Sequence, residues 1–168
     1  ARDHDAPLHI IEAVVKVNED RKRQMADKIV SACGGSVDGK TIAVLGLTFK
    51  PNTDDMRDSP SLAIVPALQK SGAKIRAFDP QGMTEAAELM PGITFCGDAY
   101  ETMEGADALA IVTEWNEFRL LDLERVKGLL SAPLIIDLRN IYKADEIIKA
   151  GFDYFSVGRD PVLAATAQ

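Results

Sequence analysis

From Thr41 onward, short apolar segments alternate with helix-forming segments, and this alternation limits the chain to very few folds. Six segments have the composition of strands: 41–47, 74–80, 93–96, 107–113, 133–138 and 152–158. Each neighbouring pair is separated by a stretch with helical spacing or helix-forming composition. Strands that alternate with helices pair in parallel, because each helix carries the chain back to the start of the next strand.

The segments 41–47, 107–113 and 133–138 are near-continuous apolar runs, as expected for strands that are covered on both faces. The right-handed crossover rule then favours the strand order 3-2-1-4-5-6. We therefore predict an α/β fold with a Rossmann-like, doubly wound, parallel six-stranded sheet.

A long helical pattern precedes the sheet and ends at Gly34–Gly35, with Asp5 as its expected N-cap. Residues at alternating steps of three and four share one face: Leu8, Ile11, Val15, Asn18, Lys22, Met25 and Ile29. About 26 residues would extend about 39 Å, which is longer than a small domain needs. Either the helix docks on its own domain, or it is a connecting or dimer-forming helix with Asn18 as a polar register residue.

Three regions follow from these patterns: a long linker or dimerisation helix over 1–35, a Rossmann-like domain over 36–160, and a loose tail over 161–168. The 168 residues carry 19 basic and 26 acidic side chains, for a net charge of −7. This balance argues against nucleic acid and anionic membranes as partners. We see neither a membrane-spanning window nor a signal peptide, and we expect a cytoplasmic protein with two reduced cysteines.

In such a sheet, ligands bind beyond the carboxyl ends of the strands, where the strand order reverses between the first and fourth strands. Three loops lie there: 48–60, 113–118 and 137–142. Five of their side chains suit such a ligand, two aromatic and three cationic: Phe49, Trp115, Lys50, Arg57 and Arg139. Guanidinium and ammonium groups bind phosphate and rings stack on bases, so this edge predicts a site for a flat, anionic ligand.

The first of these loops lacks a dinucleotide fingerprint. Only Gly46 of G-x-G-x-x-G is present, with Thr48 and Pro51 in place of the other glycines. Asp79 ends the second strand where a ribose-binding acid would stand, but an Asp-Pro pair also starts turns. Fold alone therefore does not indicate a nicotinamide dinucleotide site.

Each candidate residue also has a purely structural interpretation. Lys50 and Arg57 could pair with the three acids of their own loop, Asp54, Asp55 and Asp58. Trp115 could be a packing ring, and Arg139 a buried structural arginine. His4 and His9 stand far from these loops and are poor candidates for acid–base catalysis.

Four segments, GKTIAVLGLTFKPNTDDMRDSPSL, IRAFDP, ADALAIVTEWNEF and IIDLRNIY, resemble the C-terminal domain of the UDP-glucose/GDP-mannose dehydrogenase family, nearest its members that oxidise UDP-glucose. EAVVKVNEDRKRQM resembles the end of the family's long central helix. The resemblance runs from Leu8 to Gly158. It is specific, because it includes a long string of polar residues in a loop.

The resemblance implies oxidation of the C6 alcohol of a UDP-sugar with two NAD molecules and a cysteine thiol. It assigns substrate contacts to Phe49, Lys50 and Arg139, and contact with the NAD phosphates to Arg57. The NAD domain and the catalytic cysteine would precede this part. Independently of the resemblance, the length of the helix and its apolar stripe lead us to expect a homodimer formed through it. The C-terminal domain would bind the UDP half of the substrate.

Neither Cys33 nor Cys96 fits the family's nucleophile motif, so we expect no catalytic residue and no metal here, and a piece of a longer enzyme that is inactive alone. UDP-glucose is the favoured substrate, ahead of UDP-N-acetylhexosamines and GDP-mannose. The alternative of a different class is a stand-alone nucleotide-binding regulatory module.

Overall fold

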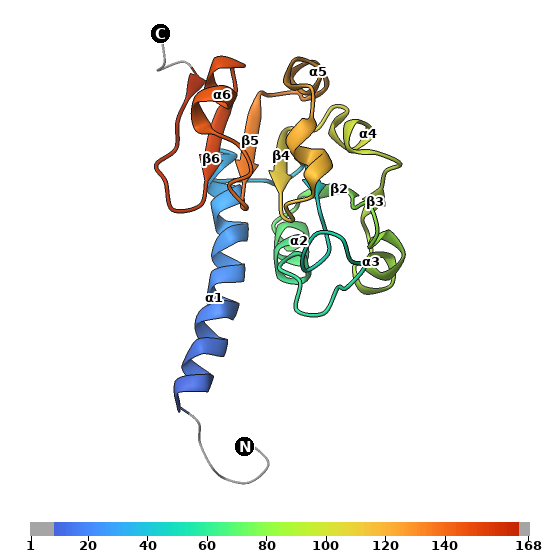
Figure 1. Cartoon of the computed structure of the whole chain (residues 1–168), viewed down its shortest axis with the longest axis vertical. Helices are drawn as coiled ribbons and strands as arrows, with labels where there is room; N and C mark the ends of the chain where they lie inside the picture. Colours follow the sequence, from blue (N-terminus) through green and yellow to red (C-terminus); the bar gives the residue numbers. More distant parts are fainter. Residues whose placement is uncertain (1–8, 165–168) are drawn as a thin grey trace.

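The computed structural model describes residues 9–164, which form six strands and their connecting helices (Figure 1). The elements in chain order are α1 (His9–Ala32), β1 (Thr41–Leu45), α2 (Ser61–Lys70), β2 (Lys74–Phe78), α3 (Met83–Leu89), β3 (Thr94–Phe95), α4 (Ala99–Met103), β4 (Ala108–Ile111), the 3₁₀ helix η2 (Asn116–Leu120), α5 (Leu123–Leu129), β5 (Leu134–Asp137), α6 (Ala144–Lys149) and β6 (Asp153–Ser156). The expected cap Asp5, and Leu8 and His4, lie outside the described residues.

The strands form one parallel sheet in the order β3-β2-β1-β4-β5-β6. Val44 in the central strand pairs with Ala77 on one side and Ala110 on the other. The predicted Rossmann-like topology is confirmed, and the order reverses between β1 and β4. The carboxyl ends of these two strands therefore flank the expected ligand position.

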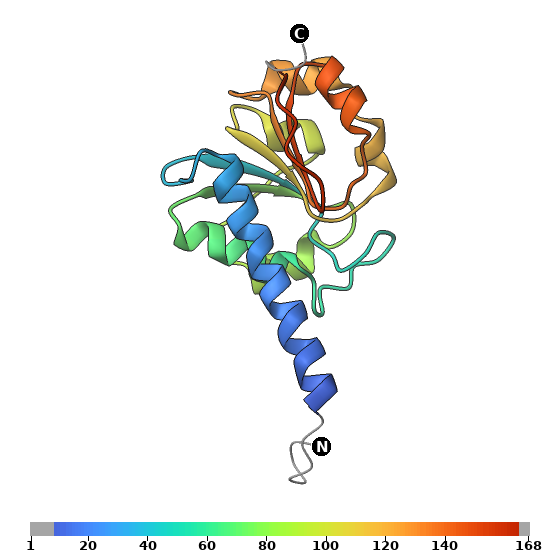
Figure 2. The ribbon, with the colours of Figure 1, turned by 90° about the vertical axis from the view of Figure 1, so that its left-hand side faces the viewer.

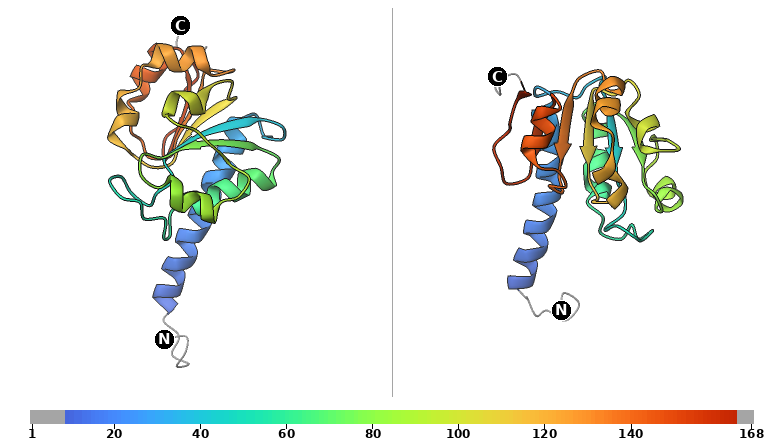
Figure 3. Two further views of the ribbon diagram at one scale, coloured as in Figure 1. Left: turned by 90° about the vertical axis from the view of Figure 1, so that its right-hand side faces the viewer. Right: turned by 45° about the horizontal axis from the view of Figure 1, so that its top comes forward.

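Helices cover both faces of the sheet (Figure 3), and successive residues of β1 alternate between the two layers. Ile42 and Val44 pack in the layer that includes α1 and α2, while Ala43 and Leu45 pack in the layer of α4, α5 and α6. All four are 0% exposed. Burial on both faces is why the central strands are continuous apolar runs.

The two halves of α1 have different surroundings (Figures 1 and 2). Ala26 and Ile29, in the C-terminal half, are 3% and 0% exposed and pack in the core beside α2. Val14 and Val17, in the N-terminal half, are 54% and 64% exposed, and this half projects beyond the sheet. The docked-helix interpretation therefore describes only the C-terminal half of α1.

One strand boundary differs from the sequence expectation: the third strand is only Thr94–Phe95, which leaves Cys96 just beyond it. The helix α2 begins at Ser61, after Pro60. The Ser59 hydroxyl oxygen still accepts a hydrogen bond from the Ser61 amide at 3.3 Å.

The C-terminal segment, which was expected to be loose, is attached at Val162. This residue exchanges two backbone hydrogen bonds with Tyr154 of β6, at 2.8 and 3.0 Å. Residues 165–168 lie outside the described part of the chain.

Gly46, directly after β1, brings two central strands into close approach. Its backbone has φ +86°, and a Cβ atom there would lie 2.5 Å from Thr113 Cβ and 2.6 Å from Thr113 N. Because both neighbouring atoms belong to a buried residue, the backbone would have to move to admit a side chain.

We predict that Gly46→Ala lowers the free energy of unfolding by about 3 kcal/mol or more, since it adds overpacking to left-handed strain. Gly105→Ala is the matched control, because Gly105 has φ +69° with no atom within 4 Å of the added Cβ. It should cost only about 1–2 kcal/mol. Urea unfolding of both variants checks the difference, and equal losses would contradict the close approach.

Candidate site at the carboxyl edge of the sheet

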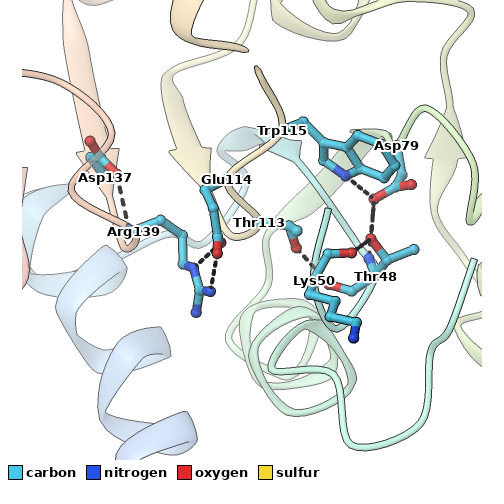
Figure 4. Close-up of polar contacts among 8 residues, drawn as sticks. All are labelled: Thr48, Lys50, Asp79, Thr113, Glu114, Trp115, Asp137 and Arg139. Atoms are coloured by element: carbon cyan, nitrogen blue, oxygen red, sulfur yellow. Dashed lines mark hydrogen bonds and ion pairs between the residues drawn. The ribbon is translucent and has the colours of Figure 1, made fainter. Parts of the chain in front are cut away.

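A buried carboxylate connects three of the loops at the carboxyl edge of the sheet (Figure 4). Asp79, directly after β2, is 1% exposed. Its Oδ2 accepts hydrogen bonds from the amides of Leu47 and Thr48 at 2.7 and 3.1 Å, and from the Thr48 hydroxyl at 3.1 Å. Oδ2 also accepts the Trp115 indole N–H at 3.1 Å. The loops after β1, β2 and β4 therefore meet at one oxygen.

The other oxygen of Asp79 serves its own turn. Oδ1 accepts the amides of Gln81 and Gly82 at 3.0 and 2.8 Å. Asp79 is thus both the turn starter that the sequence allowed and the link between loops. With both oxygens engaged inward, it is not free to bind a ribose, and together with Thr48 and Pro51 this leaves a loop that does not fit a dinucleotide.

Trp115 does not offer its ring to a ligand. It is 5% exposed and packs in the core layer of α4, α5 and α6. A buried indole needs an acceptor for its N–H, and Asp79 supplies one. Of the two interpretations of Trp115, the packing ring is therefore correct and the stacking platform is wrong.

In the loop after β1, Phe49 and Lys50 are exposed, whereas the preceding Thr48 is buried. The Phe49 amide donates to the Asp55 carbonyl at 2.8 Å, and the Phe49 side chain is 46% exposed. The Thr113 hydroxyl donates to the Thr48 carbonyl at 2.6 Å and ties the loop to β4. Within the described residues, the Lys50 ammonium makes no hydrogen bond or ion pair.

Arg57 is paired within the same loop. Its Nε and Nη2 donate to the two carboxylate oxygens of Asp55, each at 2.9 Å, although the side chain is 89% exposed. These hydrogen bonds lower the pKa of Asp55 to about 2. Arg57 therefore pairs with an acid of its own loop, as one interpretation of the sequence proposed, whereas Lys50 forms no ion pair with the acids of this loop.

Arg139, after β5, is paired with an acid from the neighbouring loop after β4. Its Nε and Nη2 donate to Oε2 and Oε1 of Glu114, the latter at 2.7 Å. Burial is the largest single influence on Glu114 and would raise its pKa. The hydrogen bonds from Arg139, a backbone hydrogen bond and the charges of Arg139 and Arg119 together outweigh burial, and the pKa is lowered. The Arg139 side chain is 33% exposed, so it is neither fully buried nor free.

The backbone of Arg139 is fixed by Asp137, which is 0% exposed. The Asp137 carboxylate accepts the Arg139 amide at 3.0 Å, the Tyr142 amide at 3.1 Å and the Tyr154 hydroxyl at 2.8 Å. Burial is the main cause that raises the pKa of the Tyr154 hydroxyl, which therefore stays a donor to Asp137.

A groove of about 500 Å³, which we call the α1 groove, lies between α1 and this edge of the sheet. On one side it is lined by Val15, Asn18, Glu19, Arg21, Lys22 and Met25 of α1. On the other side it is lined by Phe49, Asp58, Pro60, Ile64, Val112, Leu138, Arg139 and Val157. Its volume is in the usual range of small-molecule pockets, and it combines apolar walls with a few charges.

The structure thus divides the predicted site residues. Phe49 and Arg139 line the α1 groove, with Lys50 next to Phe49 in the chain. Arg57 lines a separate groove, which includes Glu85 and Glu88 of α3.

Sequence reasoning missed Glu114 as the partner of Arg139. The available signal was an acid in the loop after the strand expected to adjoin the strand of Arg139. Sequence reasoning also missed Asn18 and Lys22 as groove residues, because their helix was read only for its apolar face.

Other chemistry has little support in the part of the chain that the structure describes. There, no group of three or more His, Cys, Asp or Glu side chains is arranged to hold a metal ion. Burial raises the pKa of the Cys33 thiol, the opposite of what activates a nucleophile. No helix among residues 9–164 is long and apolar enough to cross a membrane.

Comparison with known proteins agrees with the fold and the loops. Residues 43–144 match the model of the UDP binding domain of the UDP-glucose/GDP-mannose dehydrogenase family. The chain belongs to this family.

Among curated relatives, it is 55% identical to the UDP-glucose 6-dehydrogenase of Rhizobium meliloti over 95% of its length, and 42% identical to UDP-glucose 6-dehydrogenase TuaD of Bacillus subtilis over 96%. It spans 36% and 35% of these two relatives, about a third of their length.

Solved structures place the same fold in related enzymes. An NDP-N-acetyl-D-galactosaminuronic acid dehydrogenase from Methanosarcina mazei has a TM-score of 0.80 at 28% identity, over 94% of this chain and 33% of that chain. A UDP-glucose dehydrogenase from Pyrobaculum islandicum has a TM-score of 0.67 at 29% identity, over 80% of this chain and 30% of that chain.

We predict that Asp79→Asn lowers the free energy of unfolding by about 3 kcal/mol, because an amide removes the charge that several buried donors share. The single tryptophan should report the change, since Trp115 donates to Asp79 and its emission should shift when that bond is lost. Asp122→Asn is the matched control, because Asp122 is an exposed N-cap and asparagine caps equally well. Similar unfolding midpoints for both variants would contradict the central role of Asp79.

Proposed function

We propose that this chain is the UDP-sugar-binding part of an NAD-dependent UDP-glucose 6-dehydrogenase, which oxidises UDP-glucose to UDP-glucuronate. The observation that carries the proposal is that Phe49 and Arg139 both line the α1 groove, and that Lys50, next to Phe49 in the chain, has no ion-pair partner among the described residues. The match of residues 43–144 to a UDP binding domain supports the same assignment.

The chemistry of these side chains suits a nucleoside diphosphate. The guanidinium of Arg139 binds phosphate oxygens through several N–H groups, and Lys50 adds a point charge. The half-exposed ring of Phe49 offers an apolar surface to the base or ribose. Since the chain carries a net charge of −7, an anion needs such a local cluster to bind.

UDP-glucose is the favoured sugar nucleotide because UDP-glucose 6-dehydrogenases are the curated relatives at 55% and 42% identity. A UDP-D-ManNAc dehydrogenase from Pyrococcus horikoshii is similar at 27% identity with a TM-score of 0.76, and it keeps UDP-N-acetylhexosamines as the second candidate. The shared nucleotide half accounts for why one groove would serve both substrates.

The NAD site belongs, in this proposal, to a part of the enzyme outside this chain. The loop after β1 lacks two of the three glycines of a dinucleotide site, and both carboxylate oxygens of Asp79 accept hydrogen bonds from backbone amides. NAD supplies the hydride acceptor when it is bound. From this chain, Arg57 would contribute its exposed guanidinium to the NAD phosphates from a groove separate from that of Arg139.

Two further attributes belong to the proposal. Cys33 and Cys96 are both buried and unpaired, which suits a reducing compartment such as the cytoplasm. The outer half of α1 would be covered by a second copy of the chain, since it exposes Ile11, Val14 and Val17 on one projecting helix.

We predict that Lys50→Ala and Arg139→Ala each weaken UDP binding by about 1–3 kcal/mol, or about 5- to 150-fold. Arg139→Lys should also weaken binding, because a point charge does not replace a planar fork. Arg57→Ala is the control and should leave UDP affinity unchanged. Amide NMR titrations with UDP measure all four variants. Unchanged affinity in both alanine variants, with native-like spectra, would overturn the site.

We also predict concentration-dependent self-association that Val14→Glu and Val17→Glu abolish, because a charge on the projecting face opposes its burial. Leu120→Glu is the control, since Leu120 is 83% exposed on η2, away from α1. Sedimentation velocity distinguishes the species. A wild-type chain that remains monomeric at high concentration would refute the proposed pairing.

A further inference from the structure

The guanidinium of Arg139 is held by an acid from another loop, and we propose that Glu114 is a positioning residue that presents one edge of Arg139 to a phosphate in the α1 groove. This inference rests on the proposed function, since it concerns the same groove and a ligand with a diphosphate. No reaction step depends on Glu114 in this proposal. Its contribution is the orientation of a binding group.

The guanidinium of Arg139 keeps donors that Glu114 does not occupy. Arginine has five N–H groups, one on Nε and two on each Nη. Glu114 occupies Nε and one N–H of Nη2 in a two-point contact (Figure 4). Within the described residues, Nη1 has no hydrogen-bond partner. The Nη1/Nη2 edge is therefore the one left for a ligand, and Arg139 lines the α1 groove.

The loop that carries Arg139 is fixed at further points. Asp137 accepts its backbone amide, and the side chain of Asn140 exchanges two hydrogen bonds with the backbone of Val157, at 3.0 and 2.9 Å. Since the backbone is already held, the remaining freedom of Arg139 lies in its side-chain torsions. Glu114 restricts those torsions, because it holds the guanidinium at the tip of the side chain.

Burial makes the contact between Arg139 and Glu114 more than a surface ion pair. The two side chains are 33% and 28% exposed, whereas both members of the Lys143–Glu146 pair are more than half exposed. The partners are 25 residues apart and belong to loops after adjacent strands, so the sheet itself sets their spacing. Bidentate geometry adds direction as well as attraction.

An acid beside a binding arginine could instead compete with the ligand for it. The geometry favours positioning, because Glu114 and a phosphate would use different edges of the same planar group. A guanidinium already held in place loses less rotamer freedom when the phosphate binds. Ordering one such side chain changes affinity about two- to tenfold.

The test uses this chain with Glu114→Gln and Glu114→Ala, and Glu117→Gln as the matched control. Glu117 lies in the adjacent η2 segment, and no hydrogen bond or ion pair joins it to Arg139 in the described structure. Two quantities are measured by NMR: the affinities for UDP and for uridine, and the order of the Arg139 Nε–H group. Uridine lacks phosphates, so its affinity reports the contacts of the base and ribose without the contact between Arg139 and a phosphate.

We expect both Glu114 variants to bind UDP about two- to tenfold more weakly, with uridine affinity unchanged and the Arg139 Nε–H signal more mobile. Glu117→Gln should change none of these. In an Arg139→Ala background, Glu114→Ala should cause no further loss, because the two residues act as one unit.

A gain in UDP affinity in Glu114→Ala would show competition and overturn the proposal. An unchanged Nε–H signal together with unchanged affinity would also overturn it. Failure of the proposed function gives a different result: the wild-type chain and Arg139→Ala would not differ in UDP binding. In that case an unchanged order of the Nε–H group in the Glu114 variants would still refute the positioning role by itself.

Discussion

The carboxylate of Asp79 is the interaction on which the carboxyl edge of the sheet depends. A buried charge is tolerated only when hydrogen bonds replace its lost hydration, and here amide, hydroxyl and indole donors do so. These donors come from the loops after β1 and β4, while the other oxygen closes the turn after β2. A buried carboxylate without these donors would destabilise the fold. With them, Asp79 fixes the relative positions of three loops. Phe49 and Lys50 directly follow Leu47 and Thr48, whose amides donate to Asp79. Leu47 and Thr48 cannot move without leaving the buried carboxylate short of donors.

This arrangement also differs from that of a dinucleotide-binding sheet. In a dinucleotide-binding sheet, glycines after the first strand leave room for phosphates at the switch point. Here the side chains of Thr48 and Trp115 are hydrogen-bonded to Asp79 next to that position. Of the three fingerprint glycines only Gly46 is present, and it lies against Thr113. The available space is displaced to the α1 groove, between the long helix and the edge of the sheet.

The strands, their order and the long helix were predictable from sequence because burial on two faces leaves continuous apolar runs and a helix leaves a regular spacing. The loops that carry the site residues were predictable for the same reason, since topology alone brings them to one edge. The partners within the site were not. Arg139 pairs with Glu114 across 25 residues, and Trp115 turns inward to Asp79 across 36. Such contacts depend on register and side-chain torsions, which no local pattern encodes.

The three cationic side chains at this edge differ in whether a carboxylate holds them. Arg57 and Arg139 are each held by a carboxylate, so each contributes direction with little net positive charge. Lys50 has no such partner in the described residues, although its charge helps to lower the pKa of Asp55. In the proposed site, the net attraction of a UDP-sugar would therefore originate mainly from Lys50, while Arg139, which lines the α1 groove, would orient its phosphates. Such an arrangement in the proposed site would attract an anion weakly from a distance and select it by geometry at contact, in a chain whose net charge is −7.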